Sequence, residues 1–220
     1  MKRLFLICLI LCMLAVSTGC KQAFPTAEGN KQGTSPTRGN KQNVTTTGPD
    51  IKIAYGCIDY PVYNSAEEIN QIATHIFKGK VTRVFFEVLN LFTSQPPKLE
   101  DKYCQAKLFT VYEIEVTAKY KGEVAETEYI CVVGGLETML AEQKQIMEKA
   151  GIYDPLLGVV IYKPYHPLSV GSSYFFSVAE NNGEYRDIIN QSQFAMALNE
   201  KDTQQRVTPE QIKEYLKSNP

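Results

Sequence analysis

The segment 109–120, FTVYEIEVTAKY, constrains the fold most, because apolar and polar residues alternate along it. Its apolar positions are Tyr112, Ile114, Val116 and Ala118, and its polar positions are Glu113, Glu115, Thr117 and Lys119. Neighbouring side chains of a strand point to opposite faces of a sheet. The pattern therefore predicts a strand with one buried and one solvated face, as antiparallel sheets have.

Several other segments have the composition of strands. A long strand with aromatic residues is expected in KGKVTRVFFEVLNLF, up to the break at Pro96 and Pro97, and a shorter apolar one in EYICVVGG, residues 128–135. Two more are predicted in SYFFSVAE, residues 173–180, and QFAMAL, residues 193–198. The sequence thus predicts five or six strands.

Three helices are expected between and after these strands. SAEEINQIATHIF begins with an S-x-x-E capping box formed by Ser65 and Glu68, with Ile69, Ile72 and Ile76 on one face. Residues 137–150 form an inserted helix that Gly151 ends, and TPEQIKEYL begins with Thr208 as N-cap. We expect a mainly β fold: a small antiparallel OB-like barrel with flanking short helices and one inserted helix.

The order of these elements resembles the netrin-like or tissue-inhibitor-of-metalloproteinase-like OB-fold domains of many bacterial surface lipoproteins. The resemblance covers residues 76–178 and rests on Tyr120-Lys121-Gly122-Glu123, on Gly134-Gly135 and on the Val170-Gly171 turn. Two features depart from it: a longer helical insert after Gly135, and the apolar segment PLLGVVIYKPYHP. These motifs are structural, so the resemblance implies a fold and carries no activity by itself.

The N-terminus has the organisation of an export signal. Lys2 and Arg3 precede an apolar stretch from Leu4 to Val16, which is too short to span a bilayer, since that takes about 20 residues. Val16 to Cys20 resembles the lipobox of bacterial lipoproteins, with Ser17 where such signals usually carry Leu. The resemblance implies a signal peptide over residues 1–19 and a diacylglycerol and N-acyl lipid on Cys20. The alternative is an ordinary secretory signal cleaved near Gly19.

A flexible tether is expected between Cys20 and the folded part. Residues 21–50 contain a ten-residue repeat, KQAFPTAEGN, KQGTSPTRGN and KQNVTTTGPD, with no apolar periodicity. We expect three regions: the signal peptide 1–19, the lipidated cysteine and tether 20–50, and the barrel domain 51–220. Such a chain would sit in the cell membrane by its lipid anchor and face the extracytoplasmic side.

The domain keeps three cysteines, so at most one disulfide forms within it. Cys104 with Cys131 is the predicted pair, because both flank predicted strands; the alternative is that all three are reduced. No CxxC spacing occurs and only His75 and His166 are available as further ligands, so no metal site is expected.

Candidate catalytic groups are few, and we predict no catalytic residue. Cys57 with His75 or His166 lacks the sequence context of a nucleophile and base. Glu113 and Glu115 share one strand face, as on any half-solvated strand. An inhibitor mechanism of the resembling family would need a free N-terminal cysteine amine, which lipid on Cys20 would occupy.

The charge of the chain also limits its partners. Without the signal it has 21 Lys and Arg against 24 Asp and Glu, which disfavours nucleic-acid binding. The sequence favours a lipid-anchored binding or structural module that is not an enzyme and needs no cofactor, with the bilayer and an envelope protein, peptide or glycan as partners. The alternative is a hydrolase or protease regulator that uses Cys57 or the Glu113 and Glu115 face.

Overall fold

A computed structural model describes residues 51–98, 105–163, 167–180, 184–198 and 206–219. The fold of these residues is mainly β, as expected. The strands are β1 (Ile53–Cys57), β2 (His75–Asn90), β3 (Ala106–Lys121), β4 (Thr127–Val133), β5 (Val159–Lys163), β6 (Ser173–Ala179), β7 (Arg186–Ile188) and β8 (Ala195–Ala197). The helices are α2 (Ala66–Ile72), α3 (Leu140–Lys149) and α4 (Pro209–Ser218).

Five strands close into a ring, which confirms the barrel-like fold. Their order is β2-β3-β4-β7-β6, and β6 pairs back with the first six residues of β2. All contacts around the ring are antiparallel except β4 with β7, which is parallel. The short β8 adds to the outer edge of β6 through Tyr174, Phe175 and Phe176.

Side chains fill the inside of the barrel. Phe77, Tyr112, Ile114, Ile130 and Phe176 are fully buried there and belong to one apolar cluster. β2 pairs with both β3 and β6 at Gly79, next to a register shift between Lys78 and Gly79. A Cβ at this position would lie 2.4 Å from Cγ2 of Ile114, so no larger residue fits without a shift of β3. The barrel is therefore a packed core rather than a channel.

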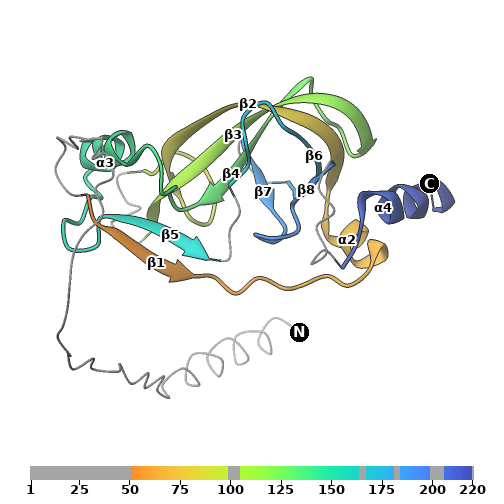
Figure 1. Ribbon diagram of the computed structural model, residues 1–220, viewed down its shortest axis with the longest axis horizontal. Coiled ribbons are helices and arrows are strands. Elements are labelled where there is room, and N and C mark those ends of the chain that lie inside the picture. Colours follow the sequence, from red (N-terminus) through yellow and green to blue (C-terminus); the bar gives the residue numbers. More distant parts are fainter. Residues whose placement is uncertain (1–50, 99–104, 164–166, 181–183, 199–205, 220) are drawn as a thin grey trace, which may run out of the picture. The chain divides into compact units, whose positions relative to one another are not determined.

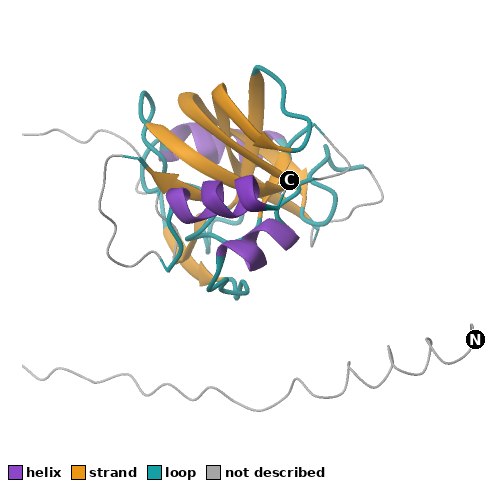
Figure 2. Cartoon of the chain, turned by 90° about the vertical axis from the view of Figure 1, so that its right-hand side faces the viewer, coloured by secondary structure: helices purple, strands orange, loops and turns teal. Residues whose placement is uncertain are grey.

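The helices lie at two ends of the barrel (Figures 1 and 2). α3 connects β4 to β5 at one end, as the predicted inserted helix, while α2 and α4 pack together at the other. Thr208 and Gln211 form a capping box at the start of α4, where Thr208 was the predicted N-cap. Ser65 caps α2 by accepting a hydrogen bond from the amide of Glu68.

The helix predicted over SAEEINQIATHIF is shorter than expected. α2 ends at Ile72, and His75, Ile76 and Phe77 already belong to β2. Ile69 and Ile76 are buried, but they belong to different elements, and Ile72 is exposed. Both isoleucines belong to the same apolar core cluster, but Ile76 reaches it from a strand, because the pairing of β2 with β3 and β6 begins there.

The apolar segment after α3, which departs from the family resemblance, forms β5. It pairs in parallel with β1, a strand that the sequence did not suggest. From Cys57 the chain continues along residues 58–64, here called the strap, to α2 (Figure 1). The strap is held by Gln193, whose amide accepts from the amide of Tyr63 and donates to its carbonyl. Two strap residues, Ile58 and Tyr60, contact the outside of the barrel, where Tyr60 lines a pocket.

Candidate binding face on the outside of the barrel

The outward side chains of β2, β3 and β4 form a continuous surface, here called the outer face. Strand register aligns them in rows: Arg83, Glu113 and Tyr129 in one, Phe85, Val111 and Cys131 in the next, Glu87, Phe109 and Val133 in a third. Because successive residues of a strand alternate between faces, all nine side chains lie on the same side of the sheet. Four of these side chains, Val111, Cys131, Phe109 and Val133, are buried in a second apolar cluster, and the other five are at least partly exposed.

Two aromatic side chains, Phe85 and Tyr129, lie in the partly exposed area of this face. Phe85 meets Tyr129 edge to face with ring centroids 6.4 Å apart, and Tyr129 meets Tyr185 in the same way at 6.3 Å. The guanidinium of Arg83 lies 4.5 Å from the centroid of Phe85. Phe85 and Tyr129 are half-buried, so part of each ring is open to solvent. A partly exposed, ordered aromatic surface is typical of binding sites.

Charged groups frame the aromatic rings. Arg83 forms an ion pair of 3.0 Å with Glu113, which also accepts a hydrogen bond from the hydroxyl of Thr82. The hydroxyl of Tyr185 donates to Glu87 at 2.6 Å. Burial, that hydrogen bond and the charge of Glu87 raise the pKa of Tyr185, so its hydroxyl stays a donor at neutral pH.

A pocket of about 160 Å³ lies where the strap approaches the outer face. Its walls are Tyr60, Leu91, Phe109, Val133 and Ile188, and its polar groups are Ser94, Cys131 and Asp187. Ile58 of the strap packs against the apolar cluster of this face, which includes Phe109 and Cys131. The pocket therefore combines an aromatic and aliphatic wall with one carboxylate.

Asp187 is the central polar group of the pocket. Its Oδ1 atom accepts hydrogen bonds from the hydroxyl of Ser94 at 2.9 Å and from the thiol of Cys131 at 3.4 Å. Burial, with the charge of Asp187, raises the pKa of both the Cys131 thiol and the Tyr60 hydroxyl, so both remain neutral. The groups that hold the carboxylate within the described part of the chain are thus neutral.

The loop after β2 positions Ser94 in the pocket. The Asn90 side chain accepts from the amide of Phe92, and the amide of Ser94 donates to the Asn90 carbonyl. Ser94 has a φ of 47°, in the left-handed region that costs a residue with a Cβ about 1 kcal/mol. Its side chain is nevertheless buried, pointing at Asp187. The turn thus accepts backbone strain and places a donor on the carboxylate.

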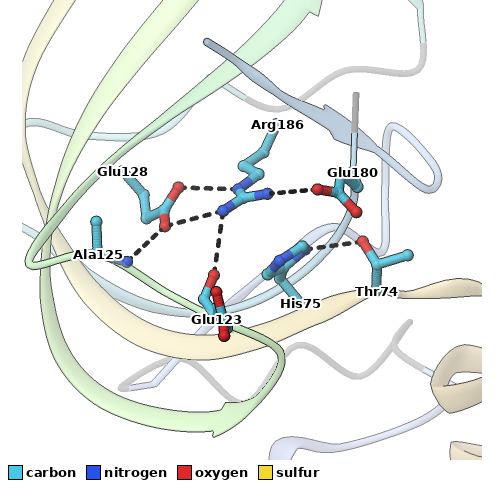
Figure 3. A network of polar contacts seen from close by, with 7 residues as sticks. All are labelled: Thr74, His75, Glu123, Ala125, Glu128, Glu180 and Arg186. Atoms are coloured by element: carbon cyan, nitrogen blue, oxygen red, sulfur yellow. Dashed lines mark hydrogen bonds and ion pairs between the residues drawn. The ribbon is translucent and has the colours of Figure 1, made fainter. Parts of the chain in front are cut away.

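A second polar cluster surrounds Arg186, the neighbour of Asp187 in β7 (Figure 3). The Arg186 guanidinium pairs with Glu128 at 2.9 Å and with Glu180 at 4.0 Å, and donates to the carbonyl of Glu123. Glu128 also accepts from the amide of Ala125. Each charge in this cluster has a partner, and it joins the β3–β4 turn to β6 and β7 where the barrel closes.

His75, one of the two predicted candidate bases, lies beside this cluster (Figure 3). Its Nδ1 is 2.8 Å from the hydroxyl of Thr74. Burial, followed by the nearby Arg186, lowers its pKa, so the ring is neutral at pH 7. Cys57 is exposed at the end of β1, opposite Lys163. The structure does not bring His75 and Cys57 together into a nucleophile and base.

The two predicted carboxylates, Glu113 and Glu115, lie in different surroundings. Glu113 belongs to the outer face and is bound by Arg83 and Thr82, whereas Glu115 lies in a shallow polar depression lined also by Lys119 and Glu126. Cys20, Cys104 and His166 lie outside the described residues, so the lipid on Cys20 and the disulfide of Cys104 with Cys131 stay predictions. Within the described part of the chain no group of three His, Cys, Asp or Glu side chains is placed to hold a metal ion.

Sequence reasoning missed the centre of the site. Asp187 and Tyr60 lie in short segments without periodicity, and β7 has three residues. Cys131 was noted as a residue of the strand YICVV, but nothing in the sequence places it next to Asp187, 56 positions later. The alternation in β3 did identify Glu113 as an outward residue of the face.

The comparisons with known proteins find no match for this chain, either among models of protein families or among curated proteins. Among the described residues, moreover, no helix has the length and apolar character needed to cross a membrane.

Proposed function

We propose that this protein is an envelope lipoprotein, anchored through lipid on Cys20, whose barrel is a binding module with the outer face as its recognition surface. The observation that carries the proposal is the pair of partly exposed aromatic rings of Phe85 and Tyr129, of which Tyr129 also contacts the buried ring of Tyr185. Rings of this kind supply large contact areas at low entropic cost. Their mutual contacts fix them before any ligand arrives, which favours affinity.

The filled interior supports the same function. Because Tyr112, Phe77 and Phe176 occupy the barrel, a ligand is better accommodated on its outside. OB-like barrels often bind oligomeric ligands through a sheet face and adjoining loops, which is an analogy at the level of the fold. The partner we propose is another envelope component, a protein, a peptide or a glycan, and the tether 21–50 would let the module reach it.

The test measures binding of the purified chain to isolated envelopes over a range of protein concentrations. We expect saturable binding without chemical turnover, and a loss of at least tenfold in affinity for the double variant Phe85→Ala, Tyr129→Ala. The matched control is Tyr55→Ala, which removes an aromatic ring that is 60% exposed on β1. Circular dichroism and thermal unfolding of each variant exclude loss of the fold as the cause.

Three results would contradict the proposal. Equal loss of binding in the Tyr55 control would show that exposed aromatic residues act without regard to position. A hydrolytic activity in the purified chain that Cys57→Ala or Glu115→Gln abolishes would favour the alternative of a hydrolase or protease regulator. A Cys20→Ala chain should leave the membrane fraction, and its retention there would contradict the lipid anchor.

A further inference from the structure

We propose that the pocket beside Asp187 binds a primary alkylammonium group, of the kind that ends a lysine-type side chain, on the ligand of the outer face. This inference rests on the proposed function and names the chemistry of one contact within it. The pocket adjoins the outer face directly, since Cys131 and Phe109 belong both to that face and to the pocket lining.

The charge of Asp187 favours a cationic ligand. Asp187 is half-buried, and within the described part of the chain it forms no ion pair. Its neighbour Arg186 is committed to Glu128 and Glu180 on the other side of β7. The groups that do contact Asp187, a hydroxyl and a thiol, carry no charge. A cation supplied by a ligand would complete the ion pair that the described residues leave open.

The hydrogen-bonding geometry of the Asp187 carboxylate favours an ammonium over a guanidinium. Both neutral donors bind Oδ1 of Asp187, and among the described residues no hydrogen bond reaches Oδ2. A guanidinium binds a carboxylate best as a fork that uses both oxygens. An ammonium is a compact charge that one oxygen can hold. The single open oxygen therefore matches an alkylammonium.

The size and the lining of the pocket also fit an alkylammonium group. A volume of about 160 Å³ is comparable with cavities of about 150 Å³ that hold a benzene-sized molecule, and so accommodates an ammonium with its last methylenes. Tyr60 and Phe109 provide aromatic rings beside the carboxylate, and Leu91 and Ile188 provide aliphatic contacts. Aromatic faces attract cations, and the aliphatic wall suits the methylene stem.

The experiment titrates the purified full chain in detergent with three probes and follows backbone amide shifts by NMR. The probes are the N-acetyl methylamides of lysine, norleucine and arginine, which present an ammonium, a neutral isostere and a guanidinium. We expect saturable shifts at Cys131, Asp187 and Ile188 with the lysine probe, binding at least tenfold weaker with norleucine, and weaker binding with arginine than with lysine.

Three variants localise the effect. Asp187→Asn keeps the acceptor for Ser94 and removes the charge, so the lysine probe should bind at least tenfold more weakly. Glu180→Gln is the matched control, because it removes a carboxylate that is 65% exposed and lies on the Arg186 side; its binding should be unchanged. Tyr60→Ala removes a wall while leaving the carboxylate, and should also weaken binding.

Equal binding of lysine and norleucine probes, or unchanged binding by Asp187→Asn, would overturn the inference. Preference for the arginine probe would overturn the choice of an ammonium. Failure of this inference differs from failure of the proposed function. In the first case the chain still binds envelopes through Phe85 and Tyr129 but ignores the lysine probe; in the second, envelope binding itself is absent.

Discussion

Arg186 and Asp187 are consecutive residues of β7, yet their surroundings differ: Arg186 has charged partners, whereas the described donors to Asp187 are neutral. The guanidinium of Arg186 has two carboxylate partners and a carbonyl, on the side where β4, β6 and the β3–β4 turn meet. The carboxylate of Asp187 projects to the other side, where it contacts one hydroxyl and one thiol. Strand alternation alone separates the two environments.

The difference distinguishes a charge that serves the fold from one available to a ligand. A buried ion pair is costly to assemble, but breaking it leaves an uncompensated charge, so the Arg186 cluster is sensitive to single substitutions. Asp187 faces a pocket and, among the described residues, has no charged partner to lose. The two residues therefore offer a direct test of which side of β7 carries stability and which carries recognition.

The largest effect is expected from Arg186→Met. The Glu128 carboxylate is 6% exposed and would lose its guanidinium, so we expect a decrease of about 3 kcal/mol in the free energy of unfolding, measured with urea. The double variant Arg186→Met, Glu128→Gln removes the stranded charge and should recover much of the loss. A single-variant cost below about 1 kcal/mol would show that the cluster does not stabilise the barrel.

A pH-dependent effect is expected from His75, beside the same cluster. Its pKa is lowered in the folded protein by burial and by Arg186, from about 6.5 in the unfolded chain. The unfolded state thus binds the proton more readily, so the stabilising contribution is present above about pH 6.5 and decreases as the pH falls through the folded pKa. Urea unfolding between pH 7.5 and 5 should show a weaker pH dependence for His75→Gln; identical slopes would contradict the assignment.

The smallest effect on stability is expected from Asp187→Asn. The amide oxygen still accepts from Ser94, and no described cation loses a partner, so the free energy of unfolding should change by less than about 1 kcal/mol. Urea unfolding beside Arg186→Met provides the measurement. A cost as large as that of Arg186→Met would remove the distinction between the two sides of β7.

Much of the fold was predictable from local pattern. Alternation identified β3, β-branched and aromatic residues identified β2 and β6, and capping residues located the starts of α2 and α4. Such signals fail where an element is short or its partner is distant. β7 has three residues, and β1 exists only because β5, about 100 residues later, pairs with it. The helical spacing of Ile69, Ile72 and Ile76 predicted a helix that was too long, because Ile76 pairs as part of β2.

The candidate site was predictable in part. The outward position of Glu113 follows from alternation, but its ion pair with Arg83 depends on the register of β2 against β3, which includes a shift between Val81 and Arg83. The pocket joins residues from the strap, the loop after β2, β3, β4 and β7. Residues that come together from five segments leave no spacing to detect.

The sequence by itself determined the mainly β character and the outward or inward position of residues in the longest strands. These properties follow from composition and from the two-residue period of a strand, which act locally. Tertiary structure alone decided how the ring closes and which charge is paired. Closure sets Arg186 among carboxylates and turns Asp187 toward a pocket beneath the strap, because both outcomes depend on strands far apart in sequence.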